Sequence, residues 1–311
     1  MKILVTGATG MVGRNIVENP KIRAATLFAP TSDEMNLSSY ESTVGYLKSN
    51  TPDLIIHCAG RVGGIQANIK NPVSFLVDNL DMGRNLVLGA RELGVRQILN
   101  LGSSCMYPKD HDGKLSEDMI LDGKLEPTNE GYALAKIATQ KLCEYVTKEN
   151  PSLHYKTIIP CNLFGRYDKF DLENAHMIPA VIRRMHEAKL NGLSTIEMWG
   201  DGTARREFMY VGDLVDFIVF ALDRFEKMPS LLNVGLGFDY SIDDYYRAIA
   251  DAVGFEGKSV HNLARPIGMK RKLVDVEKLA TFGWKSPTDL TTGIRRTYDY
   301  MLESAGRASE F

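Results

Sequence analysis

Short, continuous apolar runs alternate with longer segments of helical spacing over the first half of the chain. The apolar runs cover residues 2–6, 25–29, 53–60, 97–101 and 155–160. Each run predicts a strand covered on both faces, as in a parallel sheet, because a strand with one wet face would alternate polar and apolar residues. The helical spacing is clearest over 71–94 and 130–149. This alternation predicts an α/β fold, a doubly wound parallel sheet of the Rossmann kind.

The regular rhythm loosens after residue 165. A polar loop over 167–175 leads to a predicted helix that carries Arg183 and Arg184, and another helix is expected near 241–253. We therefore expect a second, smaller lobe for substrate binding. The boundaries are 1–165, with a return crossing near 207–235, for the dinucleotide-binding domain, and 166–206 with 236–311 for the substrate-binding lobe.

Composition narrows the class of protein. Of 311 residues, 44% are hydrophobic and 24% charged, and 37 basic against 39 acidic side chains leave a net charge of −2. This balance gives no electrostatic reason to expect nucleic acid or an anionic membrane as a partner. No apolar run approaches the roughly 18 residues of a membrane span. The first strand begins at residue 2, leaving no room for a signal peptide, so we expect a cytoplasmic protein.

The four cysteines are widely separated in the sequence. Cys58, Cys105, Cys143 and Cys161 form no C-x-x-C pair. This spacing favours reduced thiols over a disulfide framework, and it predicts no metal site. His57 and Cys58 are interpreted as packed strand residues, because no partner lies at the spacing of metal ligands.

A glycine-rich turn follows the first strand. Gly7, Gly10 and Gly13 are spaced G-x-x-G-x-x-G between a strand and a helix. Glycines allow a sharp turn and a close approach of a pyrophosphate, which then rests on the N–H groups at the start of the helix. A plain structural turn is the alternative. After the second strand, Thr31 and Ser32 stand where an acid for the ribose 2′-hydroxyl is usual, so the choice between NAD and NADP stays open.

Tyr132 and Lys136 lie four residues apart in a predicted helix. That spacing places the phenol and the ammonium on one face. A nearby positive charge favours phenolate, so we expect Lys136 to lower the pKa of Tyr132 and suit it to proton transfer at a carbonyl. The alternative is an ordinary surface helix. At the end of the strand over 97–101, Ser103, Ser104 and Cys105 lie where open parallel sheets bind ligands.

Together these motifs resemble the extended short-chain dehydrogenase/reductase superfamily, and within it the GDP-L-fucose synthase family. The narrower resemblance is carried by Val62–Ile65, Gly102–Pro108, Leu125–Glu130, His176–Arg184 and Trp199–Gly202. That family epimerises C3 and C5 of GDP-4-keto-6-deoxy-D-mannose and reduces C4 with NADPH. The resemblance thus implies an NAD(P)-dependent epimerase/reductase that makes GDP-L-fucose.

The resemblance also implies roles for single residues. Ser103 would hydrogen-bond the C4 oxygen, Tyr132 would protonate it, and Lys136 would hold the cofactor ribose. Cys105 and His176 would exchange protons at C3 and C5, which the C4 ketone acidifies. The positions matching the family's cofactor-binding residues are Gly7, Thr9, Gly10, Met11, Val12, Gly13, Leu101, Ser103, Tyr132, Lys136, Pro160, Asn162, Leu163 and His176. Those matching substrate-binding residues are Ser104, Arg184, Trp199, Arg206, Lys272 and Asp275.

One departure from the family concerns the cofactor. The family pattern has an arginine in the glycine turn and another after the second strand, both for the NADP 2′-phosphate, where this chain has Thr9 and Ser32. NADP is therefore expected by resemblance, while NAD is not excluded.

Two other functions remain alternatives. One is a C4-reductase of a related GDP-4-keto sugar, such as a 6-deoxy-heptose or a 3,6-dideoxy sugar, with or without epimerisation. The other is a non-catalytic, dinucleotide-sensing protein. The resemblance further implies a homodimer, in which helices over about 71–94 and 130–149 from each subunit form a four-helix bundle.

Overall fold

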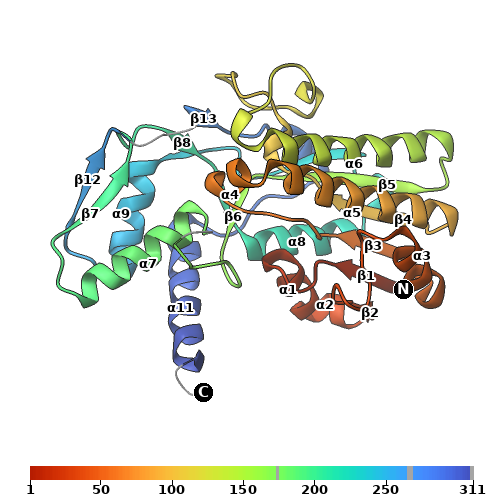
Figure 1. Cartoon of the computed structure of the whole chain (residues 1–311), viewed down its shortest axis with the longest axis horizontal. Coiled ribbons are helices and arrows are strands. Elements are labelled where there is room, and N and C mark those ends of the chain that lie inside the picture. The colour runs from red at the N-terminus through yellow and green to blue at the C-terminus, as the bar shows by residue number, and fades with distance from the viewer. Residues whose placement is uncertain (173–174, 265–268, 309–311) are drawn as a thin grey trace.

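The computed structural model describes residues 1–172, 175–264 and 269–308, and a six-stranded sheet is its largest element (Figure 1). Its order is β10-β5-β4-β3-β1-β2, and every pairing within it is parallel. The strands are β1 (Lys2–Thr6), β2 (Thr26–Phe28), β3 (Leu54–His57), β4 (Gln97–Leu101), β5 (His154–Pro160) and β10 (Leu231–Val234). The predicted doubly wound parallel sheet is confirmed. Strand order reverses between β1 and β3, where such sheets bind ligands.

Helices cover both faces of this sheet. Alternate residues of β1 enter different cores. Ile3 and Val5 pack in the cluster that contains α8 (Val211–Leu222), while Leu4 packs in the cluster that contains α5 (Pro72–Glu92). This two-sided burial explains the continuous apolar runs of the sequence. The helices of one face are α3 (Tyr40–Asn50), α5 (Pro72–Glu92) and α6 (Glu130–Glu149), and those of the other include α1 (Met11–Glu18), α2 (Pro20–Arg23), α8 (Val211–Leu222) and α10 (Glu277–Phe282).

A third core belongs to the part of the chain drawn at the left of Figure 1. It is built from three helices and a two-stranded parallel sheet, with edge-to-face aromatic pairs such as Phe208 and Tyr245 inside. The elements are α7 (Met177–Leu190), α9 (Ile242–Val253), α11 (Leu290–Ala308), β7 (Thr195–Trp199) and β12 (Lys258–Asn262). The helix predicted near 241–253 is therefore present as α9.

Two small sheets and several short turns join these parts. In one sheet, β8 (Arg205–Arg206) lies between β11 (Tyr240–Ser241) and β13 (Arg271–Lys272). In the other, β6 (Asn162–Phe164) pairs with β9 (Phe208–Tyr210). The remaining elements are α4 (Ile65–Lys70), η1 (Ser104–Met106), η2 (Glu117–Met119), η3 (Pro127–Asn129) and η4 (Phe225–Lys227). In the described part of the chain, no helix is both long and apolar enough to cross a membrane.

Candidate active site

The glycine turn at the switch point of the sheet has the shape of a dinucleotide cradle. Gly7 has φ +68°, and a Cβ there would lie 2.7 Å from the backbone of Ala59. A Cβ on Gly13 would lie 2.1 Å from the Gly7 carbonyl oxygen, so only glycine fits both positions. Gly10 precedes α1 and supplies no side-chain cap, which leaves the first N–H groups of the helix for an anion. The residues present therefore fit a dinucleotide pyrophosphate.

The other predicted cofactor positions gather around the same edge. Thr9 is in the turn, Met11 and Val12 begin α1, Leu101 and Pro160 are the last residues of β4 and β5, and Asn162 and Leu163 lie in β6. Because all strands of the sheet are parallel, their carboxyl ends meet at this edge. The amide of Asn162 is engaged with the Glu207 carbonyl oxygen at 3.1 Å.

Tyr132 and Lys136 lie in the first two turns of α6, beside the end of β4. Lys136 is 7% exposed, and its ammonium donates to the Leu101 carbonyl oxygen at 3.0 Å and lies 5.9 Å from the centre of the Tyr132 ring. The Tyr132 hydroxyl hydrogen-bonds with Ser103. Ser103 and Tyr132, two of the predicted catalytic residues, are thus in contact. Because Lys136 is buried, the alternative of an ordinary surface helix with a solvated lysine is excluded.

The prediction that Lys136 lowers the pKa of Tyr132 is wrong. Burial, followed by the charge of nearby Cys105, raises the pKa of Tyr132, and the hydrogen bond with Ser103 opposes this only in part. Burial also lowers the pKa of Lys136 to about 8. The physical reason is loss of hydration, which penalises a phenolate and an ammonium alike. The phenol therefore keeps its proton, as a proton donor requires.

Cys105 is half-buried in the same group. Its backbone N–H donates to the Ser103 hydroxyl at 3.3 Å. Its sulfur lies 3.2 Å from the Asn129 amide nitrogen and 3.5 Å from the Lys272 ammonium. Ser104, between Ser103 and Cys105, is buried. The strand end predicted to bind ligand therefore brings Ser103, Cys105 and Tyr132 together.

His176 precedes α7 at the border of this edge. A Cβ on Gly64, in the loop after β3, would lie 3.9 Å from the Ala175 carbonyl oxygen, so the residue before His176 adjoins that loop. His176 is exposed as a residue, yet desolvation by neighbouring atoms and the positive charge of Lys169 lower its pKa. The structure gives no contact within the described residues that joins its ring to Cys105.

Apart from Ser104, the predicted substrate residues come from the second part of the chain. Arg184 donates to the Glu197 carbonyl oxygen at 3.0 Å and to the Tyr246 hydroxyl at 2.7 Å. Trp199 ends β7 with 43% of its surface exposed. Arg206 and Lys272 are partners in the register of β8 and β13. Asp275 lies after β13, and its carboxylate accepts the Glu277 N–H at 2.8 Å, a local bond at the start of α10.

Sequence reasoning missed three residues that shape this region. Asn129 contacts the Cys105 sulfur, and Asp239 bridges Arg205 and Arg271. Glu207 is buried and accepts N–H groups from Leu236, Gly237 and Val274, and burial raises its pKa to about 7. These contacts join residues up to 67 positions apart in the sequence, so no local pattern could reveal them. The available signals were the run of charge over 205–207 and the place of Asn129 within the Leu125–Glu130 segment.

Two residues expected to be structural have that character. His57 is 2% exposed and its Nδ1 lies 2.8 Å from the Thr6 hydroxyl. Burial and the neighbouring charge of Lys136 lower its pKa to about 3, so it is neutral near pH 7. Cys58 follows it, and the four cysteines are free thiols. No group of metal-binding side chains occurs among the residues that the structure describes.

Comparison with known proteins assigns this architecture to a family. Residues 3–235 match the family described as NAD dependent epimerase/dehydratase. GDP-L-colitose synthase of Yersinia pseudotuberculosis is 54% identical over 302 residues, covering 97% of this chain and 98% of that protein. GDP-L-fucose synthase of Azorhizobium caulinodans is 44% identical over 301 residues, covering 97% and 96%.

Solved structures of similar fold are also named as enzymes of GDP-sugars. A GDP-D-glycero-L-gluco-heptose synthase from Campylobacter jejuni, crystallised in the presence of NADPH, superposes with a TM-score of 0.89. It is 26% identical, and the match covers 97% of this chain and 98% of that one. A GDP-mannoheptose C4 reductase from the same organism, with NADP bound, has a TM-score of 0.86 at 27% identity, covering 97% and 98%.

Proposed function

Because the chain belongs to the NAD dependent epimerase/dehydratase family, we propose that it converts GDP-4-keto-6-deoxy-D-mannose to GDP-L-fucose. It epimerises C3 and C5 of the sugar and reduces C4. The observation that carries this proposal is the meeting of Ser103, Cys105 and Tyr132 at the end of β4. The 44% identity to a GDP-L-fucose synthase supports the same substrate class.

Each residue has a chemical task in this reaction. Ser103 donates a hydrogen bond to the C4 oxygen as negative charge develops, and Tyr132 gives that oxygen a proton. The ketone acidifies the neighbouring C–H bonds, so Cys105 and His176 can exchange protons at C3 and C5. A nicotinamide dinucleotide, held by the glycine turn and Lys136, supplies a hydride when bound. Arg184, Arg206 and Trp199 bind the nucleotide sugar, with forked guanidinium groups suited to its phosphates.

We assign the two tasks to different parts of the chain. Residues 1–165 with 207–235 bind the dinucleotide, since β10 and α8 of the second range belong to the sheet and its cover. Residues 166–206 and 236–311 bind the sugar, with Lys272 and Asp275 at its border.

Deuterium incorporation tests the reaction. GDP-4-keto-6-deoxymannose turned over in deuterated water should give a product with deuterium at C3 and C5. Cys105→Ala should lose this label, whereas the matched Cys143→Ala, at a buried position in another core, should keep it. A reduced but unlabelled product from the wild-type protein would remove the epimerase half of the proposal.

A second candidate is reduction of a related GDP-4-keto sugar, such as a 3,6-dideoxy sugar or a 6-deoxy-heptose. The 54% identity to a GDP-L-colitose synthase and the similarity to heptose enzymes favour it. The exposed Trp199 lies where the size of the sugar would be sensed. Values of kcat/KM on the three substrates decide between the candidates, because the preferred sugar gives the largest value.

We infer that NADPH is used and that NADH is also accepted. Relatives solved with NADP or NADPH support the former. The use of NADH is inferred from the loop after β2. There the Glu34 carboxylate accepts hydrogen bonds from the Thr31 N–H at 2.8 Å and from the Thr31 hydroxyl at 3.1 Å. A carboxylate there repels a 2′-phosphate. The ratio of kcat/KM for the two cofactors measures this, and Glu34→Gln should shift it toward NADPH; no shift would contradict the inference.

The protein is further proposed to be a cytoplasmic homodimer. The four free cysteines support a reducing compartment. Two apolar stripes support the dimer: Val77 and Leu80 of α5 lie along one helix face with Leu88, and Leu134 and Leu142 of α6 along another. A cavity of about 390 Å³ lies between these helices. A second copy offering the same two helices would bury both stripes.

A further inference from the structure

The sulfur of Cys105 has hydrogen-bond donors on two sides. The Asn129 amide nitrogen lies 3.2 Å from it and the Lys272 ammonium 3.5 Å. Asn129 comes from the turn before α6, and Lys272 from β13, so the two donors reach the sulfur from distant parts of the chain. An amide NH₂ and an ammonium can only donate, which makes the sulfur the acceptor in both contacts.

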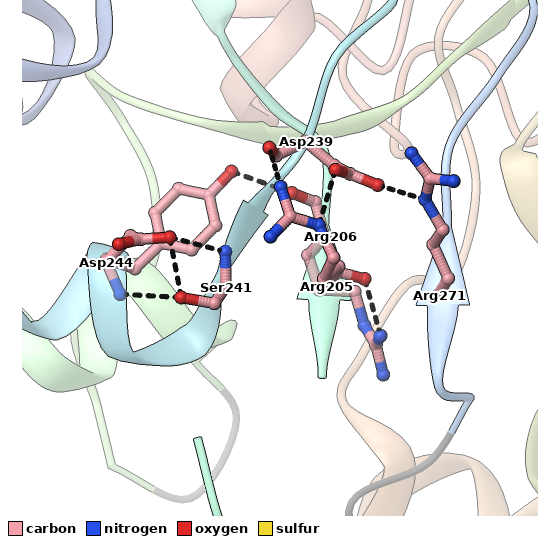
Figure 2. A network of polar contacts seen from close by, with 7 residues as sticks. Arg205, Arg206, Asp239, Ser241, Asp244 and Arg271 are labelled. Carbon is pink, nitrogen blue, oxygen red and sulfur yellow. Dashed lines mark hydrogen bonds and ion pairs between the residues drawn. The ribbon is translucent and has the colours of Figure 1, made fainter. Parts of the chain in front are cut away.

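The strand pair β8–β13, which carries Lys272, is held by the Asp239 carboxylate through Arg205 and Arg271 (Figure 2). The Asp239 carboxylate accepts from Arg205 Nε at 2.7 Å and from Arg271 Nε at 2.5 Å. Arg205 and Arg271 are register partners, and Arg206 and Lys272 are the next pair. Since side chains alternate along a strand, the clamp on one pair directs the other pair away from Asp239. The backbone of β13 is therefore held in place where Lys272 extends to Cys105.

An unsatisfied polar atom lies in the side chain that contacts the sulfur. The Asn129 amide oxygen is buried and has no hydrogen-bond partner among the described residues. Buried polar atoms are nearly always satisfied, so this oxygen is available to a sugar hydroxyl. Asn129 would then contact the sulfur through one end of its amide and the substrate through the other.

The other three thiols are in surroundings of a different kind. Burial raises the pKa of Cys58 and of Cys143 to about 12, and it raises the pKa of Cys161 as well. Cys105 and Cys58 are half-buried, whereas Cys143 and Cys161 are buried. A thiolate-specific reagent at neutral pH thus reports on Cys105.

We propose that Asn129 and Lys272 hold Cys105 as a thiolate, the form that accepts a proton from a carbon beside the C4 ketone. The inference rests on the proposed function and deepens it. In this step a C–H bond breaks and an S–H bond forms. The electron pair left on carbon moves to the C4 oxygen as an enolate, facing Ser103 and Tyr132. The carbon then takes a proton on its other face, from His176 in the proposed function, and the new thiol releases its proton to water.

Alkylation by iodoacetamide tests the proposal without any substrate. The full-length protein is treated at pH 7, and modification of the Cys105 peptide is followed by mass spectrometry. Lys272→Met should slow this reaction about tenfold or more, because a charge-assisted hydrogen bond to the thiolate is lost. The matched Lys285→Met, at an exposed position after Trp284, should react like the wild type. Equal rates in the two variants would overturn the proposal.

Two further measurements separate the outcomes. Asn129→Ala removes the neutral donor and should slow alkylation by a smaller factor than Lys272→Met, with an unchanged melting temperature as the check on folding. Lys272→Arg should restore part of the rate. If Lys272→Met slows alkylation but the wild-type protein turns over no GDP-sugar, the proposed function fails and the thiolate assignment stands. If product forms but the alkylation rates are equal, the thiolate assignment fails and the proposed function stands.

Discussion

Tyr132 and Lys136 show how burial outweighs the attraction between neighbouring groups. The ammonium lies 5.9 Å from the ring centre, yet loss of hydration raises the pKa of the phenol and lowers that of the amine. Both side chains are therefore biased to their uncharged forms. For reduction of a ketone this bias is useful, because a protonated Tyr132 can give its proton only when negative charge appears on the substrate oxygen.

Replacing Tyr132 by phenylalanine should remove this proton donor. We expect kcat to fall by roughly 10²–10⁴-fold, the usual contribution of general acid catalysis, with a smaller change in KM. Steady-state consumption of NADPH measures both constants. Tyr40→Phe, which removes an exposed hydroxyl bonded to Glu92, is the matched control and should leave both unchanged. Unchanged turnover in Tyr132→Phe would contradict the assignment of Tyr132 as the proton donor.

Lys136 predicts a pH dependence of stability. Its pKa is about 8 in the folded chain against an ordinary value of 10.5, so between these values the unfolded state binds more protons. Stability from this group therefore rises with pH from about 8 to 10.5, by an amount on the order of 3 kcal/mol. Lys136→Met should lack this rise. Urea unfolding at a series of pH values measures the difference, and parallel curves for both proteins would contradict the prediction.

At the scale of elements, the small sheet of β8, β11 and β13 organises the substrate side of the site. Glu207 ties its end to Leu236, Gly237 and Val274 through three backbone N–H groups. Asp239 holds the arginines of two strands together (Figure 2). Strands of two residues contribute few backbone hydrogen bonds, so these side chains fix their register.

Asp239→Asn should loosen the β8–β13 pair. The charge that both arginines share is lost while the size of the side chain is kept, so we expect the KM for the GDP-sugar to rise about tenfold with a smaller change in kcat, as for loss of one charge-assisted bond. Asp239→Glu should recover part of the loss. Asp251→Asn, at an exposed position of α9, is the control. A tenfold fall in kcat with KM unchanged would contradict a positioning role.

At the scale of the whole molecule, α5 and α6 lie side by side on the outer face of the sheet (Figure 1). Val73, Val77 and Leu134 are exposed there, at 71%, 43% and 42%. An apolar surface of this kind on two adjacent long helices is typical of an interface between copies of a chain.

Val77→Glu should therefore shift the protein from dimer to monomer. A carboxylate within the apolar stripe would be desolvated on association, which opposes association. Sedimentation velocity measures the change. Val260→Glu, a comparably exposed valine on β12 in the other part of the molecule, should leave the assembly intact. A wild-type protein that sediments as a monomer at every concentration would rule out the dimer.

Local sequence was enough for the large elements. The predicted strand over 2–6 and the predicted helix over 130–149 have the bounds of β1 and α6. The spacing of apolar residues and the length of each segment are enough to predict such elements. It was not enough for β8 or β13, which are two residues long and leave no period to detect. Nor was it enough for α4, a helix of six residues that begins at Ile65, because so short a helix shows no clear apolar spacing.

The sequence by itself determined the doubly wound sheet, the glycine turn at its switch point, and the chemical types Ser103, Cys105, Tyr132 and Lys136 at one edge. These follow from hydrophobic period and from steric limits that act over a few residues. Only the tertiary structure decided the pKa values of those groups and the contacts they make. Hydration is lost when distant segments pack together, so the pKa values of Tyr132 and Lys136, and the meeting of Lys272 with Cys105 across 167 residues, exist only in the folded chain.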